Sequence, residues 1–394
     1  MNQSFFLVFC ELFLGSANRY CRLSMKATKA QNIHTAFFLL ILLTFGLTST
    51  SAFAEEQSQD SIEGTTAHET FQPGEFIMHH VSDSHEWHIA TFGETDIYIP
   101  LPVILYSKKS GVNVFWSSKF HSEDHTYRHF RIAHEGPNAG KIEELNDEGT
   151  VIDLPIDLSI TKAVAGIFFS VCILLWMFLS MAKAMRKNTD KVPTGMQNML
   201  EPVIIFIRDE VAKPTIGNKK YEKYMPFLLT VFFFILLNNL MGLIPIFPFG
   251  ANVTGNVAVT MVLALFTFVI TTLNGNKHYW KEIYNPDVPW WLKYPFPLMP
   301  IVELTGVFTK PFVLMVRLFA NMLAGHMIVT VFVSLIFIFA KLMGVFAGYA
   351  VSPLSVAFSV FIVLLDVLVA FIQAYVFTIL SALYFGLATT EHHS

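Results

Sequence analysis

Charged residues are scarce in this sequence. Only 14% of its 394 residues are Asp, Glu, Lys or Arg, whereas 53% are hydrophobic. A soluble protein of this length needs more polar surface, so the composition indicates an all-α protein with several membrane-crossing helices. The net charge is only −4 and no basic run suggests nucleic acid, so nucleic acid is not an expected partner.

Nucleotide-binding motifs are also missing, and cysteine is rare. The sequence contains no Gly-rich phosphate loop and no dinucleotide fingerprint, which excludes the usual nucleotide-binding classes, and we expect no cofactor. Of the three cysteines, Cys10 and Cys21 lie in a segment that we expect to be absent from the mature chain. Cys172 then remains alone, so no internal disulfide can form.

Residues 1–54 are expected to comprise an upstream extension and a secretory signal peptide. A short basic stretch follows Met25, and the apolar core AFFLLILLTFGL precedes the small-residue site Ala52-Phe53-Ala54. This layout predicts a start at Met25 and cleavage after Ala54, the alternative being a retained anchor helix.

Residues 55–157 form a polar segment that we expect to be exported to the periplasm. Alternating runs such as GVNVFWSSKF and YRHFRIAHE predict a small domain with β structure or an extended cap. His79, His80, His85 and His88 are candidates for proton collection at a channel mouth, because imidazole titrates near neutral pH. Zinc binding and ordinary surface or core histidines are the alternatives. The spacing matches no strong metal signature, so we predict no metal site.

Residues 158–394 are expected to form a transmembrane domain with five crossing helices. The basic stretch KAMRKNTDK after the first span marks the cytoplasmic side, whereas the uncharged loop PIFPFGAN belongs outside. The N-terminus is therefore expected in the periplasm and the C-terminus in the cytoplasm. An amphipathic helix at 194–211 should lie at the cytoplasmic surface. The expected spans are residues 159–181, 225–246, 253–273, 298–339 and 354–387.

The last two expected spans are too long to cross a hydrocarbon core of roughly 30 Å at right angles. We expect them to form a tilted hairpin, with Pro300 and Pro311 as bending points. The stretch MGVFAGYAVSP is the expected turn between them.

Polar residues follow one face of the fourth expected span. Glu303, Lys310 and Arg317 recur every seven residues and drift by only about 20° per step on a helix, and Asn321 extends the stripe. An Arg near mid-bilayer costs roughly 2.5 to 17 kcal/mol, so it normally faces protein or a water-filled cavity. Arg317 is therefore the first functional candidate. The alternative is an Arg that reaches a lipid headgroup from near a helix end.

The last expected span repeats this pattern. Asp366, Gln373 and Tyr384 share one face, because their spacings are close to whole numbers of helical turns. His326 lies nine residues beyond Arg317 and therefore points to the opposite side of its helix. Such groups in two neighbouring helices predict a hydrated ion path, since each would otherwise lack a partner in hydrocarbon. The alternative for Asp366 is a capped structural residue.

Small residues flank the arginine. Ala320, Ala324 and Gly325 permit the close approach of another helix. That helix is either a partner that slides past Arg317 or a helix of the same chain.

At these residues the sequence closely resembles subunit a of the F-type ATP synthase membrane sector, from about residue 192 to the C-terminus. The most specific match surrounds Arg317, which this family places opposite the rotating c-ring. The matching positions are Lys310, Pro311, the run VRLFANM at 316–322, Ala324-Gly325-His326, the run NNLM at 238–241, Pro245, Glu303, Gln373 and Tyr384.

The sequence departs from the family pattern at a few positions. Some relatives have a carboxylate where this chain has His326 and a histidine where it has Asp366, so the pair is exchanged. Gly242 replaces an acidic residue that some relatives carry. His79 and His80 resemble a histidine pair near the family's exported N-terminus.

The resemblance implies a non-catalytic, proton-translocating subunit of the bacterial inner membrane. Protons would enter through one half-channel, bind a c-ring carboxylate and leave through a second half-channel near Glu303, with Arg317 between the two. The implied partners are the c-ring proteolipid oligomer, the peripheral-stalk b subunits, the rest of the ATP synthase and membrane lipid. The residues on the implied proton path are Asn321, His326, Asp366, Gln373, Glu303 and Tyr384.

Two other classes of protein are alternatives. An ion-coupled secondary transporter also uses intramembrane Arg, Asp and His, but the sequence has no inverted repeat and no paired broken helices. A membrane scaffold that presents the exported segment leaves Arg317 unexplained.

Overall fold

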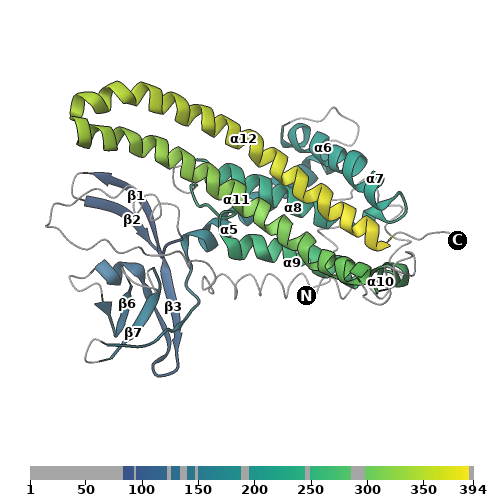
Figure 1. Cartoon of the computed structure of the whole chain (residues 1–394), viewed down its shortest axis with the longest axis horizontal. Coiled ribbons are helices and arrows are strands. Elements are labelled where there is room, and N and C mark those ends of the chain that lie inside the picture. Colours follow the sequence, from purple (N-terminus) through teal and green to yellow (C-terminus); the bar gives the residue numbers. More distant parts are fainter. Residues whose placement is uncertain are drawn as a thin grey trace.

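The computed structural model describes residues 83–92, 95–121, 126–133, 140–146, 150–187, 195–244, 249–284 and 298–389. The expected signal peptide, His79 and His80 lie outside these ranges, and so does the side chain of His88. The described chain consists of a β-rich N-terminal part followed by helices (Figure 1). This confirms the expected polytopic helical membrane protein with a small β-containing N-terminal part.

The N-terminal part contains three antiparallel sheets: the pair β1–β2, a sheet of order β4-β3-β9 and a sheet of order β5-β6-β7-β8. In β3, alternate side chains are buried, as expected for a strand with one face on a core. Val103, Leu105 and Phe115 meet Phe130 and Ile142 in that core. The strands are β1 (Glu86–Phe92), β2 (Thr95–Pro100), β3 (Pro102–Ser107), β4 (Gly111–Trp116), β5 (Thr126–Tyr127), β6 (Phe130–Ile132), β7 (Ile142–Leu145), β8 (Val151–Asp153) and β9 (Ile156–Asp157), with a 3-10 helix η1 (Ser117–His121) after β4.

The C-terminal part is a bundle of apolar helices. Among the described residues, four helices are long and apolar enough to cross a membrane, namely α5, α8, α11 and α12, and α9 with α10 makes a fifth if this pair, bent by 103°, is one span. The helices are α5 (Lys162–Lys187), α6 (Met196–Phe206), the π-helical segment η2 (Ile207–Ala212), α7 (Lys213–Ile216), α8 (Tyr221–Gly242), α9 (Val257–Leu273), α10 (Lys277–Tyr284), α11 (Leu298–Met343) and α12 (Val345–Thr389).

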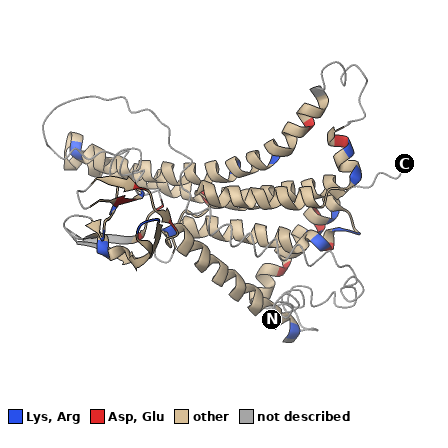
Figure 2. Ribbon diagram, turned by 90° about the horizontal axis from the view of Figure 1, so that it is seen from below, with Lys and Arg blue, Asp and Glu red and all other residues tan. Residues whose placement is uncertain are grey.

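The longest two helices, α11 and α12, form a hairpin that dominates the bundle (Figure 1). Along it, α12 packs against α8 and α11 packs against α9. The strands lie at one end of the molecule, whereas α10 and the end of α12 lie at the other end. Lys, Arg, Asp and Glu gather towards these two ends and are sparse along the helices between them (Figure 2). This distribution fits a membrane across the middle of the helices.

The turn between the last two helices is much shorter than the sequence predicted. The stretch MGVFAGYAVSP is helical except at Gly344, which has a φ of 91°. In a membrane the backbone must satisfy its own hydrogen bonds, and Gly344 O accepts them from the N–H groups of Ala347 and Gly348. The expected helix start near residue 354 is therefore wrong. One glycine in the left-handed region is enough to reverse the chain.

Candidate functional site

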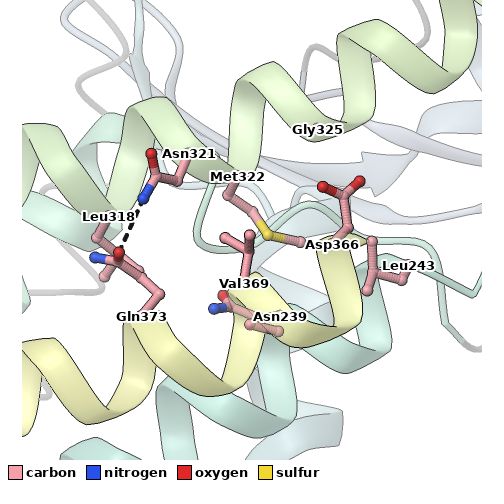
Figure 3. A pocket seen from close by; sticks show the side chains of 10 residues that line it. Asn239, Leu243, Leu318, Asn321, Met322, Gly325, Asp366, Val369 and Gln373 are labelled. Atoms are coloured by element: carbon pink, nitrogen blue, oxygen red, sulfur yellow. Dashed lines mark hydrogen bonds between the residues drawn. The ribbon is translucent and has the colours of Figure 1, made fainter. Parts of the chain in front are cut away.

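Helices α8, α11 and α12 converge on a small cavity (Figure 3). Its volume is about 10 Å³, roughly the space that the centre of one water molecule needs. Three amides and one carboxyl group are among the side chains around it, in an otherwise apolar bundle. The lining residues are Asn239, Leu243, Leu318, Asn321, Met322, Gly325, Asp366, Val369, Ala370 and Gln373.

Asn321 of α11 and Gln373 of α12 connect the two helices at this cavity. Nδ2 of Asn321 donates a hydrogen bond to Oε1 of Gln373 at 2.9 Å, the dashed line in Figure 3. Gln373 is buried, and its Nε2 donates no hydrogen bond to any described residue. A buried polar group without a partner costs about 1–3 kcal/mol, so the expected partner of this amide is water.

Asp366 of α12 lies against α11. A Cβ on Gly325 would lie 2.7 Å from both carboxylate oxygens, so only glycine at this position leaves room for the carboxyl group. Oδ2 of Asp366 is buried and accepts no hydrogen bond within the described ranges. The fold thus puts a carboxyl group that can exchange a proton with water at the cavity.

His326 of α11 faces the C-terminal end of α8. Its Nε2 lies 3.3 Å from the position that a Cβ on Gly242 would take, and the Cε of Met322 lies 3.1 Å from the same point. Gly242 is the position at which the family resemblance implied an acidic residue in some relatives. Because Gly242 has no side chain, the His326 imidazole has room at this position.

Arg317 lies on an open face of α11 rather than in the cavity. Asn321, one turn further along, is also exposed but lines the cavity, so the two regions adjoin. Small exposed residues beside the guanidinium leave room for another helix. The open face contains Arg317, Ala320, Asn321 and Ala324, whereas the adjacent face of the helix is buried and contains Leu314, Leu318, Met322 and Gly325.

The remaining sequence-predicted residues form a second group towards the start of α11. Nζ of Lys310 lies 5.9 Å from the centre of the Tyr384 ring, and Arg317 is close enough to Tyr384 for an electrostatic interaction. Glu303 interacts in the same way with Tyr279 of α10. Glu303 and Tyr384 therefore lie away from the cavity that contains Asp366, which keeps the two groups of residues separate.

Sequence reasoning did not single out Asn239 as a site residue. Asn239 is buried, lines the cavity, and accepts a hydrogen bond at 2.6 Å from Oγ1 of Thr254 through its Oδ1. Its neighbour Asn238 donates to the carbonyl of Phe234 at 2.8 Å. Two consecutive amides in the apolar run FFFILLNNLMG were the available signal, because a buried amide needs a specific partner.

Among the candidate proton-collecting histidines, the described side chain of His85 has a defined contact. Its Nε2 lies 2.7 Å from Oδ2 of Asp157. Burial raises the pKa of Asp157. The hydrogen bond and charge of His85 and the hydrogen bonds from Ser159 outweigh burial, so the pKa of Asp157 lies below its ordinary value. Within the described ranges, no group of His, Cys, Asp or Glu could hold a metal ion. Proton collection by these histidines stays a prediction.

Comparisons with known proteins converge on one family. A family model described as the ATP synthase A chain matches residues 165–386, and one described as a domain of unknown function matches residues 76–160. ATP synthase subunit a of Chloroherpeton thalassium is 44% identical over 242 residues, which cover 60% of this chain and 68% of the relative. ATP synthase subunit a 2 of Chlorobaculum tepidum is 36% identical over 341 residues, or 85% of this chain and 78% of the relative. ATP synthase subunit a of Myxococcus xanthus is 40% identical over 289 residues, or 72% and 90%.

The larger match covers most of the helical part, including every residue that lines the cavity. It supports a multi-pass protein of the bacterial membrane that works with the rest of the ATP synthase, and nothing supports a secondary transporter. The chain therefore belongs to the ATP synthase subunit a family, and it is a proton-translocating stator subunit of the F-type ATP synthase.

Proposed function

We propose that the cavity between α8, α11 and α12 belongs to the half-channel through which protons enter from the outer side of the membrane. The observation that carries this proposal is the pair of buried polar atoms, Oδ2 of Asp366 and Nε2 of Gln373, beside a space of water size. A hydrated path accounts for both atoms, since each would otherwise be a buried polar group without a partner. Asn321 and His326 complete this half-channel.

Arg317 is the proposed separator of the two half-channels and faces the c-ring proteolipid oligomer. Its positive charge attracts the ionised ring carboxylate and repels a proton that would pass directly between the half-channels. Each proton that crosses 100 mV carries about 2.3 kcal/mol, which a leak past Arg317 would dissipate. Ala320 and Ala324 leave room for the ring helix beside it.

The second half-channel is proposed near Glu303 and Tyr384, towards α10. This arrangement puts the C-terminus in the cytoplasm and the N-terminus in the periplasm, consistent with the basic residues Lys183 and Arg186 at the end of α5. We divide the chain into the leader 1–54, the exported segment 55–157 and the transmembrane domain 158–394. Peripheral-stalk b subunits are further proposed partners, on family membership alone.

The four candidate histidines would then lie on the proton-entry side. In this arrangement His79, His80, His85 and His88 collect protons at the mouth of the entry half-channel. The contact of His85 with Asp157, which precedes the start of α5 by five residues, supports a position of this histidine near that helix end.

The substitution Arg317→Ala tests the proposed role of Arg317 as the separator of the two half-channels. We expect it to abolish ATP-driven proton pumping in inverted membrane vesicles while the chain stays in the membrane, because removing the charge also removes a cost of burial. Lys341→Ala is the matched control, since it removes a cation from the other end of the same helix. Substantial pumping by the Arg317 variant, at equal membrane abundance, would sink the assignment.

A further inference from the structure

One sheet of the N-terminal part has an outer face that is apolar and uncovered. The pairing of β3 with β4 puts Val112 opposite Tyr106, Val114 opposite Ile104 and Trp116 opposite Pro102, so these side chains share one face. On β4 the exposed fractions are 66% for Val112, 61% for Val114 and 57% for Trp116. The other face of this sheet is covered by the core that contains Val103, Leu105 and Phe115.

The same face continues beyond β9 towards the first membrane helix. Ile156 pairs with Tyr106 and is 56% exposed. Next along the chain, Leu158 donates to the carbonyl of Ile104 and Ile160 donates to that of Pro102, which extends the pairing. We call this surface the outer sheet face. It comprises Pro102, Ile104, Tyr106, Val112, Val114, Trp116, Ile156, Leu158 and Ile160.

This face is attached directly to a membrane-crossing helix. Ile160 lies two residues before Lys162, at which α5 begins, and two residues span at most about 7 Å. Asp83 fixes this junction, because its carboxylate accepts hydrogen bonds from N–H of Ala163 at 3.0 Å and from Oγ1 of Thr161 at 2.9 Å. The end of the sheet that carries Trp116 is therefore held close to the bilayer surface.

The charges around the outer sheet face suit a lipid surface. Lys108 and Lys109 lie in the turn before β4, and Lys119 lies just after it, so exposed cations stand at both ends of this strand. Trp and Tyr are enriched at membrane interfaces, and lysines near a membrane surface are attracted to anionic phospholipid. Trp116 and Tyr106 on the face itself provide the aromatic part of this pattern. An exposed apolar patch of this kind marks an interaction site.

We propose that the outer sheet face lies on the bilayer surface at which α5 begins, with the side chains of β4 in contact with lipid. The occupant is lipid because the face continues into a membrane-crossing helix and combines apolar, aromatic and cationic side chains. This proposal gives the matched domain of unknown function a role as a membrane-contacting brace for the outer end of α5. It depends on membrane insertion of α5 and is independent of the proton path.

Spin-label accessibility in the whole ATP synthase tests this proposal. In a variant whose native cysteines are replaced by Ser, Val114→Cys carries the label, and the complex is reconstituted into vesicles that contain phosphatidylglycerol. Asn146→Cys is the matched control, because Asn146 is exposed and directly follows β7, which belongs to the sheet β5-β6-β7-β8. We expect the label at 114 to collide several-fold more often with oxygen, relative to a water-soluble nickel complex, than the label at 146.

Two results would overturn the proposal. Equal oxygen-to-nickel ratios at the two positions would mean that the face is in water. A label at 114 that is immobilised and shielded from both reagents would mean that a protein, or a second copy of this chain, covers the face. Val112→Cys provides the same measurement on the same face if the Val114 variant does not fold.

Discussion

Two glycines determine where the ionisable side chains of the site can lie. Gly325 leaves space for the Asp366 carboxylate, and Gly242 leaves space for the His326 ring and the Met322 methyl group. Each glycine belongs to a different helix from the groups that it accommodates: Gly325 of α11 faces a residue of α12, and Gly242 of α8 faces two residues of α11. The positions of the ionisable groups therefore depend on two glycines, which have no side chain that could take part in proton transfer.

The substitution Gly325→Ala tests this dependence. Its Cβ would lie 2.7 Å from both oxygens of Asp366, so the carboxyl group must move by several tenths of an ångström or more. We expect proton pumping to fall by about tenfold or more, since a 1 Å displacement of a reacting group can cost about 10²-fold. Gly306→Ala is the control on the same helix, because nothing lies within 4 Å of its Cβ position. Pumping by Gly325→Ala at the level of Gly306→Ala would show that Asp366 need not lie at this position.

The pair formed by His85 and Asp157 predicts a pH dependence in the β-rich N-terminal part. The folded-state pKa of Asp157 is lower than its ordinary value of about 3.9, so the ionised carboxylate stabilises the folded form. This stabilisation is present above about pH 4 and is lost as the pH falls through the folded-state pKa. We expect Asp157→Asn to reduce hydrogen-exchange protection of β3 and β9 at pH 7, and the difference from the parent protein to vanish on strong acidification.

Asp153→Asn provides the control for that measurement, because it removes an exposed carboxylate from a neighbouring strand. Equal protection of the Asp157 variant and the parent protein at pH 7 would contradict the predicted contribution. A difference that persists unchanged in acid would assign the effect to packing rather than to charge.

At the scale of elements, the C-terminal end of α12 is held by three other segments. Nζ of Lys220 donates to the carbonyl of Thr389 at 2.8 Å, and Nδ2 of Asn276 donates to the same oxygen at 3.1 Å. Helix ends leave carbonyl groups without partners, and these two contacts satisfy one of them. Gly386 lies directly against the backbone carbonyl of Thr215 in α7, with no room for a Cβ.

The substitution Gly386→Ala should separate α7 from α12. A rigid backbone group lies where the new methyl group must go, so one of the two elements has to move. We expect a lower amount of the chain in the membrane and a proportional loss of pumping. Leu387→Ala is the neighbouring control, since Leu387 is 52% exposed. Normal abundance of the Gly386 variant would show that the contact with α7 contributes little.

Periodicity predicted the helical elements because it is a local property of the chain. The polar stripe of α11 and the overlong pair of final helices followed directly from residue spacing. The sequence predicted a turn within MGVFAGYAVSP but not that Gly344 alone would form it, because this stretch contains several turn-forming residues and is also apolar enough to be helical. Hydrogen-bond satisfaction in the membrane decided between these two outcomes, and it left a single glycine as the break.

The candidate site was only partly predictable, because contacts between helices are not a local property of the chain. Spacing along one helix placed Arg317 and His326 on different sides, and the structure has Arg317 on the open face and His326 against Gly242. The contact between Gly325 and Asp366, and the place of Asn239 at the cavity, depend on how different helices pack. Such contacts join residues far apart in the chain, so no local pattern reports them.

At the scale of the whole molecule, the β-rich part is joined to the helices by specific contacts. Trp87 of β1 is buried in the same hydrophobic cluster as residues of α5 and α8. Gly166 of α5 allows Ala251 and Val253 to pack closely against this helix. Oδ2 of Asp83 also accepts a hydrogen bond at 3.4 Å from Nδ2 of Asn256, the N-cap residue of α9. The β-rich part is thus held against one end of each of two helices.

Asp83 provides the test of this connection. Its carboxylate accepts hydrogen bonds from Ala163, Thr161 and Asn256. Asn keeps an acceptor oxygen for a helix N-terminus, whereas Ala does not, and such a loss costs about 0.5–2 kcal/mol.

We therefore expect Asp83→Ala, but not Asp83→Asn, to increase hydrogen exchange in β1 and in the first turn of α5 within the assembled ATP synthase. Both variants should retain proton pumping, because Asp83 lies outside the cavity and away from Arg317. Equal protection in the two variants would mean that Asp83 does not hold the parts together. A loss of pumping in Asp83→Ala alone would mean that the attachment of the β-rich part also positions the helices of the proposed proton path.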